Sequence, residues 1–296
     1  MDLKVQHSFA KNQSNGVLYL VPTPIGNLDD MSFRSVKVLK YVDLIAAEDT
    51  RHTKMLLNHF QIDTKEISLH EHNKDERVPE LVQKLRQGVN MAQLSDAGMP
   101  SISDPGHELV VASIKADISV IPLPGPTAGM TSLIASGLSP QPFYFYGFLN
   151  RQNKEQLEEL KKLNQRVETF IIYEAPHRLK KTLKNMVKIL GKNRKAAICR
   201  ELTKRFEEFD RGTLTELLDY IDSKPILGEF VIIVEGNHHL NHESDATKKL
   251  ANLSINEQIN YYIKQGDKPN PAIKKIAKMH NMKKQEVYNL YHHIKK

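Results

Sequence analysis

Short apolar runs alternate with amphipathic segments between residues 17 and 123, and this alternation restricts the fold more than any other feature. Residues 78–88 show the amphipathic type, with apolar Val78, Leu81, Val82 and Leu85 at helical spacing and Gly88 at the end. The apolar runs have the length of buried strands and cover residues 17–21, 43–47, 66–70, 89–94 and 118–123. The pattern predicts an α/β domain with a largely parallel sheet.

The chain continues with a second set of strands and helices after two prolines, Pro140 and Pro142. Further strands are expected at residues 168–174, 196–202 and 229–235, and a helix over residues 177–191 ends at Gly191. The sequence therefore predicts five parts: a flexible leader (1–16), an N-terminal α/β domain (17–140), a second α/β domain (141–236), a linker (237–250) and a basic helical unit (251–296).

Positive charge is concentrated in the last part of the chain. The formal net charge is +7, and residues 248–296 alone hold eleven lysines against three acidic residues. This excess predicts contact with a polyanion, with Lys274, Lys275, Lys283 and Lys284 as candidate RNA contacts. The spacing of Ala277, Asn281 and Val287 fits the small, turn and buried positions of a helix-turn-helix. The alternative is a solvated, lysine-rich helical tail.

Other features exclude several classes of protein. No uninterrupted apolar run approaches the roughly 20 residues of a membrane span, and the polar start lacks the apolar core of a signal peptide. The single cysteine, Cys199, rules out an internal disulfide, agrees with a cytoplasmic location and is expected to be buried. His238, His239 and His242 lack an ordered ligand spacing, so no metal site is expected.

Four loops that follow predicted strands combine proline or glycine with small polar residues, namely residues 22–30, 95–106, 122–129 and 173–178. Loops after parallel strands gather at the carboxyl edge of a sheet, where ligands bind. The first loop lacks the glycine spacing of a dinucleotide site, and its prolines lack the N–H groups of a phosphate cradle. Ordinary turns explain any one of these loops, whereas four together predict a cleft.

The stretches "VPTPIGNLDD", "AAEDTRHTKMLL", "SDAGMPSISDPG", "PLPGPTA", "YEAPHR" and "RELTKRFEEFDRG", in this order, resemble the ribosomal small-subunit methyltransferase I family of the tetrapyrrole-methylase superfamily. The resemblance covers about residues 17–235 and extends to the helical unit. Superfamily members that act on tetrapyrroles usually carry a glycine-richer first loop, whereas this chain has Ile25, Gly26 and Asn27. That departure favours the RNA-modifying branch.

The resemblance implies two α/β domains of the class III methyltransferase type with S-adenosylmethionine in the cleft between them. It implies 2′-O-methylation of a cytidine in the decoding region of 16S rRNA, with the small ribosomal subunit as partner and a homodimer as assembly. The residues that match the family's cofactor-binding segments are Pro24, Gly26, Asp96, Ala97, Gly98, Thr127, Ala128 and Tyr173. Asp96 to Gly98 match the part that contacts the methionine and ribose, and Tyr173 the adenosine side.

A charged cluster directly after the second strand, with Glu48, Asp49 and Arg51, is the candidate catalytic group. Arg51 would bind a phosphate or stabilise negative charge on the acceptor oxygen. Glu48 or Asp49 would orient Arg51 or accept a proton. The alternative is that Asp49 or Thr50 caps a helix.

Further candidate RNA contacts lie in the second domain, at His177, Arg178, Arg200 and Lys204. Their alternatives are helix-cap, packing and surface-turn roles. Two rival functions remain: a superfamily methylase acting on a tetrapyrrole or other small molecule, and a nonenzymatic nucleic-acid-binding regulator. The basic helical unit argues against the first and the four cleft-forming loops against the second. The sequence leaves open which group accepts the proton and whether free rRNA or the assembled subunit is the substrate.

Overall fold

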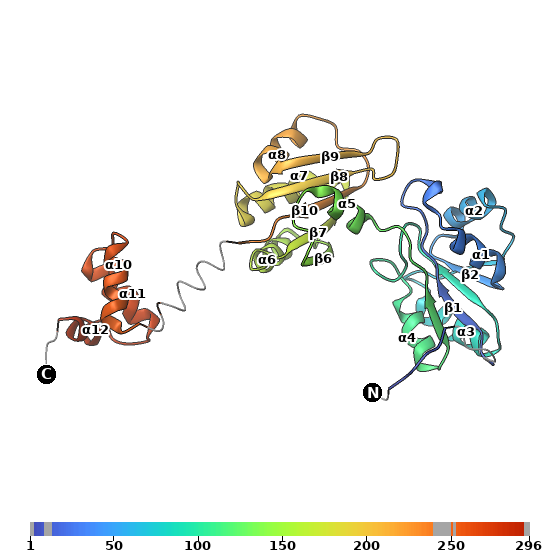
Figure 1. The fold of residues 1–296 in the computed structure, drawn as a ribbon, viewed down its shortest axis with the longest axis horizontal. Helices are drawn as coiled ribbons and strands as arrows, with labels where there is room; N and C mark the ends of the chain where they lie inside the picture. The colour runs from blue at the N-terminus through green and yellow to red at the C-terminus, as the bar shows by residue number, and fades with distance from the viewer. Residues whose placement is uncertain (1–2, 9–13, 239–249, 251–252, 293–296) are drawn as a thin grey trace. The chain divides into compact units, whose positions relative to one another are not determined.

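The computed structural model describes residues 3–8, 14–238, 250 and 253–292 (Figure 1). Residues 239–249, with most of the predicted linker and with His239 and His242, lie outside the described residues. The chain forms two compact units, one of residues 1–164 with 168–235 and one of residues 236–296 with 165–167. Each unit is described by itself below.

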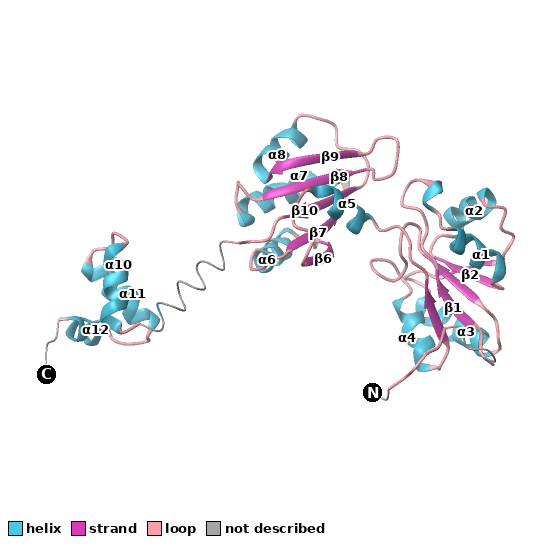
Figure 2. Cartoon of the chain, in the orientation of Figure 1, coloured by secondary structure: helices cyan, strands magenta, loops and turns pink. Residues whose placement is uncertain are grey.

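The first sheet of the larger unit is parallel throughout, as the alternating pattern predicts (Figure 2). Its strand order is β3-β2-β4-β1-β5. The strands are β1 (Val17–Leu20), β2 (Leu44–Ala47), β3 (Glu66–Ser68), β4 (Met91–Leu94) and β5 (Ser119–Pro122). All five predicted strands are therefore confirmed, and the carboxyl ends of β2, β4, β1 and β5 are neighbours along one edge.

Helices cover both faces of this sheet because its strands are apolar on both sides. In β4, Ala92 packs on one face with residues of α1 and α2, and Met91 on the other face with residues of α3 and α4. The helices are α1 (Phe33–Tyr41), α2 (Thr50–His59), α3 (Lys74–Arg86) and α4 (His107–Lys115). Adjacent strand residues point to opposite faces, so one continuous apolar strand serves two cores.

The second sheet is mixed, with strand order β6-β7-β10-β8-β9. Strands β6 and β7 are parallel, and the other neighbouring pairs are antiparallel. The strands are β6 (Phe143–Phe148), β7 (Thr169–Glu174), β8 (Lys195–Arg200), β9 (Glu208–Thr213) and β10 (Phe230–Val234). Strand β9 was not predicted from sequence, because its alternating charged residues carry no apolar run.

Helices α6 (Asn153–Leu163), α7 (Pro176–Leu190) and α8 (Leu214–Asp222) contribute to the core on one face of this sheet. Helix α5 (Ala128–Ser136) covers the other face, where Leu133 packs with Ile171, Val231 and the buried Cys199. Because α5 packs on the second sheet, the chain passes from the first sheet to the second before α5 begins. The domain boundary at residue 140 stays a prediction, with α5 on its N-terminal side.

The described part of the predicted leader is attached to the first sheet. The Gln6 side chain donates to the Val120 carbonyl and accepts from the Val120 N–H, at 3.0 and 2.9 Å. Lys4 Nζ lies 2.6 Å from Asp117 Oδ1. These residues follow the edge of β5, and the flexible leader over residues 1–16 stays a prediction.

The smaller unit contains three helices among its described residues, α10 (Ile255–Lys264), α11 (Pro269–Met279) and α12 (Lys284–Tyr291). A cluster that includes Ile259, Ile276 and Val287 forms its core. Ala277 is buried in α11, Asn281 has a φ of 52° in the turn and Val287 is fully buried in α12. These are the three positions that the spacing predicts, and the assignment of the unit as helix-turn-helix-like stays a prediction.

Candidate functional site

The first and second predicted loops are joined directly at the edge of the first sheet. Thr23 and Gly98 exchange backbone hydrogen bonds of 3.0 and 3.1 Å, and Thr23 Oγ1 donates to the Ser95 carbonyl. Gly98 has a φ of 77°, and a Cβ there would lie 3.3 Å from Ile25 Cγ2 and 3.4 Å from the Pro126 carbonyl oxygen. Glycine is therefore required where the first, second and third loops meet.

A cavity of about 620 Å³ opens at this junction, within the size range of small-molecule sites. It is lined by Ala97, Gly98 and Asp104 from the second loop, by the start of α5 and by residues of the second sheet. Tyr173 lies in its wall and accepts a hydrogen bond from the Gly129 N–H at 2.9 Å. Burial raises the pKa of this tyrosine, so it stays protonated. Phe145 and Phe148 stand edge-on to its ring, which gives an aromatic wall.

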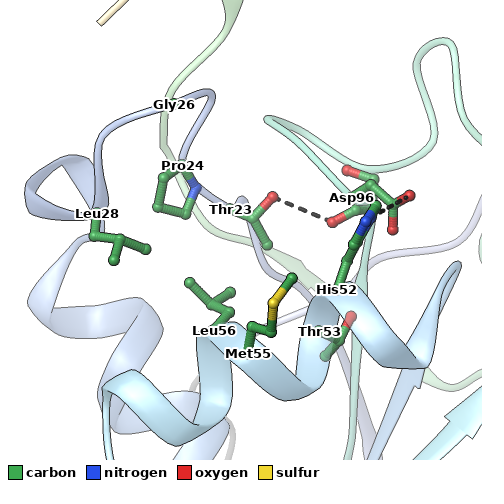
Figure 3. A pocket seen from close by; sticks show the side chains of 10 residues that line it. Thr23, Pro24, Gly26, Leu28, His52, Thr53, Met55, Leu56 and Asp96 are labelled. Carbon is green, nitrogen blue, oxygen red and sulfur yellow. Dashed lines mark hydrogen bonds and ion pairs between the residues drawn. The ribbon is translucent and has the colours of Figure 1, made fainter. Parts of the chain in front are cut away.

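The structure divides the predicted cofactor residues between two cavities. Five of them line the larger cavity: Ala97, Gly98, Thr127, Ala128 and Tyr173. The other three, Pro24, Gly26 and Asp96, line a neighbouring pocket of about 250 Å³ (Figure 3). The assignment of all eight residues to one cofactor site stays a prediction.

Several lining residues of the larger cavity were not predicted, among them Leu202, Glu229, Phe230 and Val231. Strand β10 is antiparallel to β7, with Phe230 opposite Glu174. The beginning of β10 consequently lies at the same edge as the end of β7. A search limited to residues that follow strands misses it, and only the strand order reveals it.

A group of carboxylates lies where the two cavities adjoin. Burial, followed by the nearby charges of Asp104 and Asp96, raises the pKa of Glu48 to about 7. Burial likewise raises the pKa of Asp104, which lines the larger cavity. Asp96 lines the smaller pocket, accepts a 3.2 Å hydrogen bond from the Asp49 N–H and has Oδ2 3.5 Å from His52 Nδ1. Glu48 is thus near one carboxylate of each cavity.

Asp49 and Arg51 behave differently from Glu48. The Asp49 side chain caps α2 by accepting from the Arg51 N–H at 2.9 Å, and it also accepts from the guanidinium at 2.7 and 3.1 Å. These bonds hold the pKa of Asp49 well below its usual range. The helix-cap alternative is therefore correct for Asp49, and the Arg51 side chain remains 88% exposed.

Three of the four cations predicted to contact RNA in the second domain are held in internal interactions. Arg178 donates to the Leu149 carbonyl at 2.6 Å and pairs with the buried Glu174. Arg200 donates to the Leu227 carbonyl and to Glu208. These bonds fix Arg178 and Arg200 to neighbouring loops, and their RNA contact stays a prediction.

Lys204 is the third of these cations. It pairs with Glu201 and Glu229 at 3.0 and 2.8 Å, and a Cβ at Gly26 would lie 2.5 Å from its Cγ. Lys204 is therefore held by two ion pairs in the loop after β8, and its side chain lies against the first loop. His177, in the first turn of α7, is exposed, and so is Arg205, whose guanidinium lies 5.6 Å from the Phe206 ring centre.

The lysines of the smaller unit are on its surface. Lys274, Lys283 and Lys284 are exposed, and Lys275 is exposed while paired with Asp267. Among the described residues, no group of three or more His, Cys, Asp or Glu side chains is placed to hold a metal ion. Nor does that part of the chain include a helix with the length and apolar character needed to cross a membrane.

Comparison with known proteins identifies the family. Residues 17–218 match the model of the Tetrapyrrole (Corrin/Porphyrin) Methylases. A protein of Bacillus subtilis (strain 168) called "Ribosomal RNA small subunit methyltransferase I" is 50% identical over 291 residues, 98% of this chain and 99% of that protein. Its namesake in Streptococcus pyogenes serotype M1 is 49% identical over 99% of this chain and 100% of that protein.

Solved structures with the same fold have much lower sequence identity. Cobalt precorrin-4 methyltransferase, a cobalamin biosynthetic enzyme, is 16% identical with a TM-score of 0.58, over 74% of this chain and 94% of that chain. Uroporphyrin-III-C-methyltransferase from Thermus thermophilus is 18% identical with a TM-score of 0.55, over 77% of this chain and 98% of that chain. At these identities the likeness supports the fold alone.

Proposed function

Because the chain belongs to the ribosomal RNA small subunit methyltransferase I family of tetrapyrrole methylases, we propose that it methylates the 2′-hydroxyl of a cytidine in 16S rRNA, using S-adenosylmethionine. The observation that carries this proposal is the larger cavity, which brings five residues of three predicted loops into one wall and adjoins a carboxylate group.

The lining of the larger cavity fits this cofactor. A sulfonium carries positive charge and no phosphate, and the cavity offers Asp104 as an anion, with Glu48 close by. Tyr173, Phe145 and Phe148 provide an aromatic wall against which an adenine ring can pack, and the backbone at Gly98 can approach a ligand closely. When bound, S-adenosylmethionine supplies an electrophilic methyl group on its sulfur.

The protein's own contribution is to orient the acceptor hydroxyl and to receive its proton. As the ribose oxygen bonds to the methyl carbon, the carbon–sulfur bond breaks and the hydroxyl proton must leave. Glu48 is the better proton acceptor of the two predicted candidates, because its pKa is near 7 whereas Asp49 is tied up as a helix cap. The exposed Arg51 is placed at the start of α2 to contact a phosphate of the substrate.

The RNA contacts that we propose are therefore Arg51, His177 and the exposed lysines of the smaller unit, Lys274, Lys275, Lys283 and Lys284. The lysines would supply phosphate contacts that do not depend on sequence and that weaken with salt. The substrate places the protein in the cytoplasm with the small ribosomal subunit. We also propose a homodimer, supported by large exposed apolar side chains such as Phe33 and Ile134, with sedimentation velocity as the test.

The test of the function uses purified protein, radiolabelled S-adenosylmethionine, small ribosomal subunits from a strain that lacks the enzyme, and free rRNA in parallel. We expect label in a single 2′-O-methylated cytidine. The better substrate of the two shows whether the enzyme recognises free rRNA or the assembled subunit. If cofactor binds but neither RNA is labelled, the rival function, methylation of a tetrapyrrole or other small molecule, replaces this one.

A further inference from the structure

The smaller pocket, of about 250 Å³, has a mixed lining that the cofactor site does not explain (Figure 3). One part is apolar and consists of Pro24, Leu28, Met55 and Leu56. Met55 is 65% exposed and Leu28 40% exposed, so two large apolar side chains face an open space. The other part is polar, with Asp96 next to His52, as the dashed line in Figure 3 marks.

The two cavities share their walls. Ile25, Ala97 and Gly98 line the larger cavity, whereas their neighbours Pro24 and Asp96 line the smaller pocket. The hydrogen-bonded pair Thr23 and Gly98 keeps these loops together. A ligand in the smaller pocket would consequently lie beside the cofactor site, with Glu48 near the acidic residue of each.

The size and chemistry of the smaller pocket restrict what it can hold. At about 250 Å³ it is below the roughly 300–1,000 Å³ of sites for drug-sized ligands, so it suits one heterocycle and not a four-ring macrocycle. Its apolar part suits the face of a flat ring. Asp96 suits an amino group at the edge, because a carboxylate accepts hydrogen bonds and the amino group of cytosine donates two.

Asp96 has capacity left for such a ligand. One oxygen accepts the Asp49 N–H and the other faces His52, yet a carboxylate has about four acceptor positions. More than a third of its side chain is exposed. His52 and the Asp49 N–H fix the orientation of the carboxylate, which is what discrimination between bases requires.

We propose that the smaller pocket binds the unstacked base of the acceptor cytidine, with the ring against Met55 and Leu28 and the amino group donating to Asp96. His52 is the positioning residue for Asp96. The assignment rests on the proposed function, and it moves Asp96 from cofactor binding to substrate selection. Uracil is rejected because its O4, a hydrogen-bond acceptor, would face the carboxylate. The base must be unstacked, because sequence-specific RNA sites recognise single-stranded bases.

The first experiment compares small subunits that carry cytidine or uridine at the acceptor position, and measures kcat/KM with each. We expect the wild-type protein to prefer cytidine by roughly 5- to 150-fold, the discrimination of a good base contact. In Asp96→Asn the side-chain amide can donate to O4, so the preference should disappear or reverse. Calorimetry of S-adenosylmethionine binding checks that the variant is folded and that its cofactor site is intact.

A second pair of variants tests the pocket without changing the carboxylate group. Met55→Ala should raise KM for subunits several-fold and leave cofactor affinity unchanged, whereas Ile114→Ala, an exposed residue of α4 that lines neither cavity, should change neither. His52→Ala should lower the cytidine preference. The proposed base pocket is refuted if the wild-type protein methylates both bases equally, or if Asp96→Asn keeps an undiminished cytidine preference. Either result leaves the proposed methylation itself intact. A wild-type protein with no activity on either subunit overturns the proposed function instead.

Discussion

Replacing Glu48 with glutamine should raise the stability of the protein while it lowers turnover. The pKa of Glu48 rises from 4.5 to about 7 on folding, so the folded protein disfavours the ionised carboxylate. At 1.36 kcal/mol per pKa unit the limit of this penalty is about 3 kcal/mol. Because the carboxyl is partly exposed and screened by solvent, about 1 kcal/mol is the realistic expectation.

The sign of this effect depends on pH. A raised carboxyl pKa means that the folded state binds more protons than the unfolded state between pH 4.5 and about 7. Wild-type stability therefore falls across that interval and the penalty is complete above it. Glu48→Gln removes the penalty, so its Tm should exceed that of the wild type by about 3 °C at pH 8 and by little or nothing at pH 4.5.

Turnover should change in the opposite direction. Loss of a positioned proton acceptor lowers kcat by about 10²–10⁴-fold. In the wild type the rate should fall as the pH drops through the pKa of Glu48, which a bound cationic cofactor lowers from about 7. Glu76→Gln, at an exposed position of α3, is the matched control and should change neither property. Thermal unfolding at both pH values and single-turnover methylation are the two assays. Near-normal turnover of Glu48→Gln would refute the role of Glu48 as proton acceptor. An equal Tm gain of this variant at both pH values would refute the electrostatic explanation.

Three further outcomes follow from the site. Arg51→Ala should weaken RNA binding, reduce the salt dependence of the affinity by about one phosphate contact and leave cofactor affinity unchanged. Full turnover at wild-type RNA affinity would contradict a phosphate contact at Arg51. Gly98→Ala should lower the free energy of unfolding by about 1–3 kcal/mol and weaken cofactor binding in calorimetry, because the φ of Gly98 is 77° and Ile25 and Pro126 are close. Unchanged binding would mean that this loop does not shape the site. A chain that stops before Lys248 should bind cofactor normally and bind rRNA more weakly with a shallower salt slope, and an unchanged slope would remove the lysines from the interface.

The sequence was sufficient to predict the first sheet and much of its edge, because apolar periodicity is a local signal. Strands β1 to β5 form apolar runs, and a parallel order places the loops after them together. The same reasoning fails in the second sheet. Strand β9 has no apolar run, and Glu229 reaches the cavity only because β10 runs antiparallel to β7. Strand direction is a property of the whole sheet and leaves no local trace.

Residue type alone also could not separate the roles of neighbouring charges. Glu48 and Asp49 are adjacent carboxylates, yet Asp49 caps α2 whereas Glu48 is partly buried and lies among like charges, so their pKa values move in opposite directions. Arg178 and His177 are adjacent as well, yet the first is bound to Glu174 and Leu149 while the second is exposed. In both pairs the decisive factor is which partner the fold brings within hydrogen-bonding distance.

The position of the carboxylates gives a physical reason for separating the methylation site from the RNA backbone contacts. Glu48, Asp96 and Asp104 together repel phosphate, so we expect an RNA strand to enter at that point by a base and its ribose and not to be held there by its backbone. The exposed Arg51 side chain and the exposed lysines of the helical unit are the proposed phosphate contacts instead. A cationic cofactor reverses the local repulsion, because its charge favours ionised Glu48 and lowers the pKa of that group. Cofactor binding should therefore release protons near pH 7, and this prepares the proton acceptor before the hydroxyl arrives.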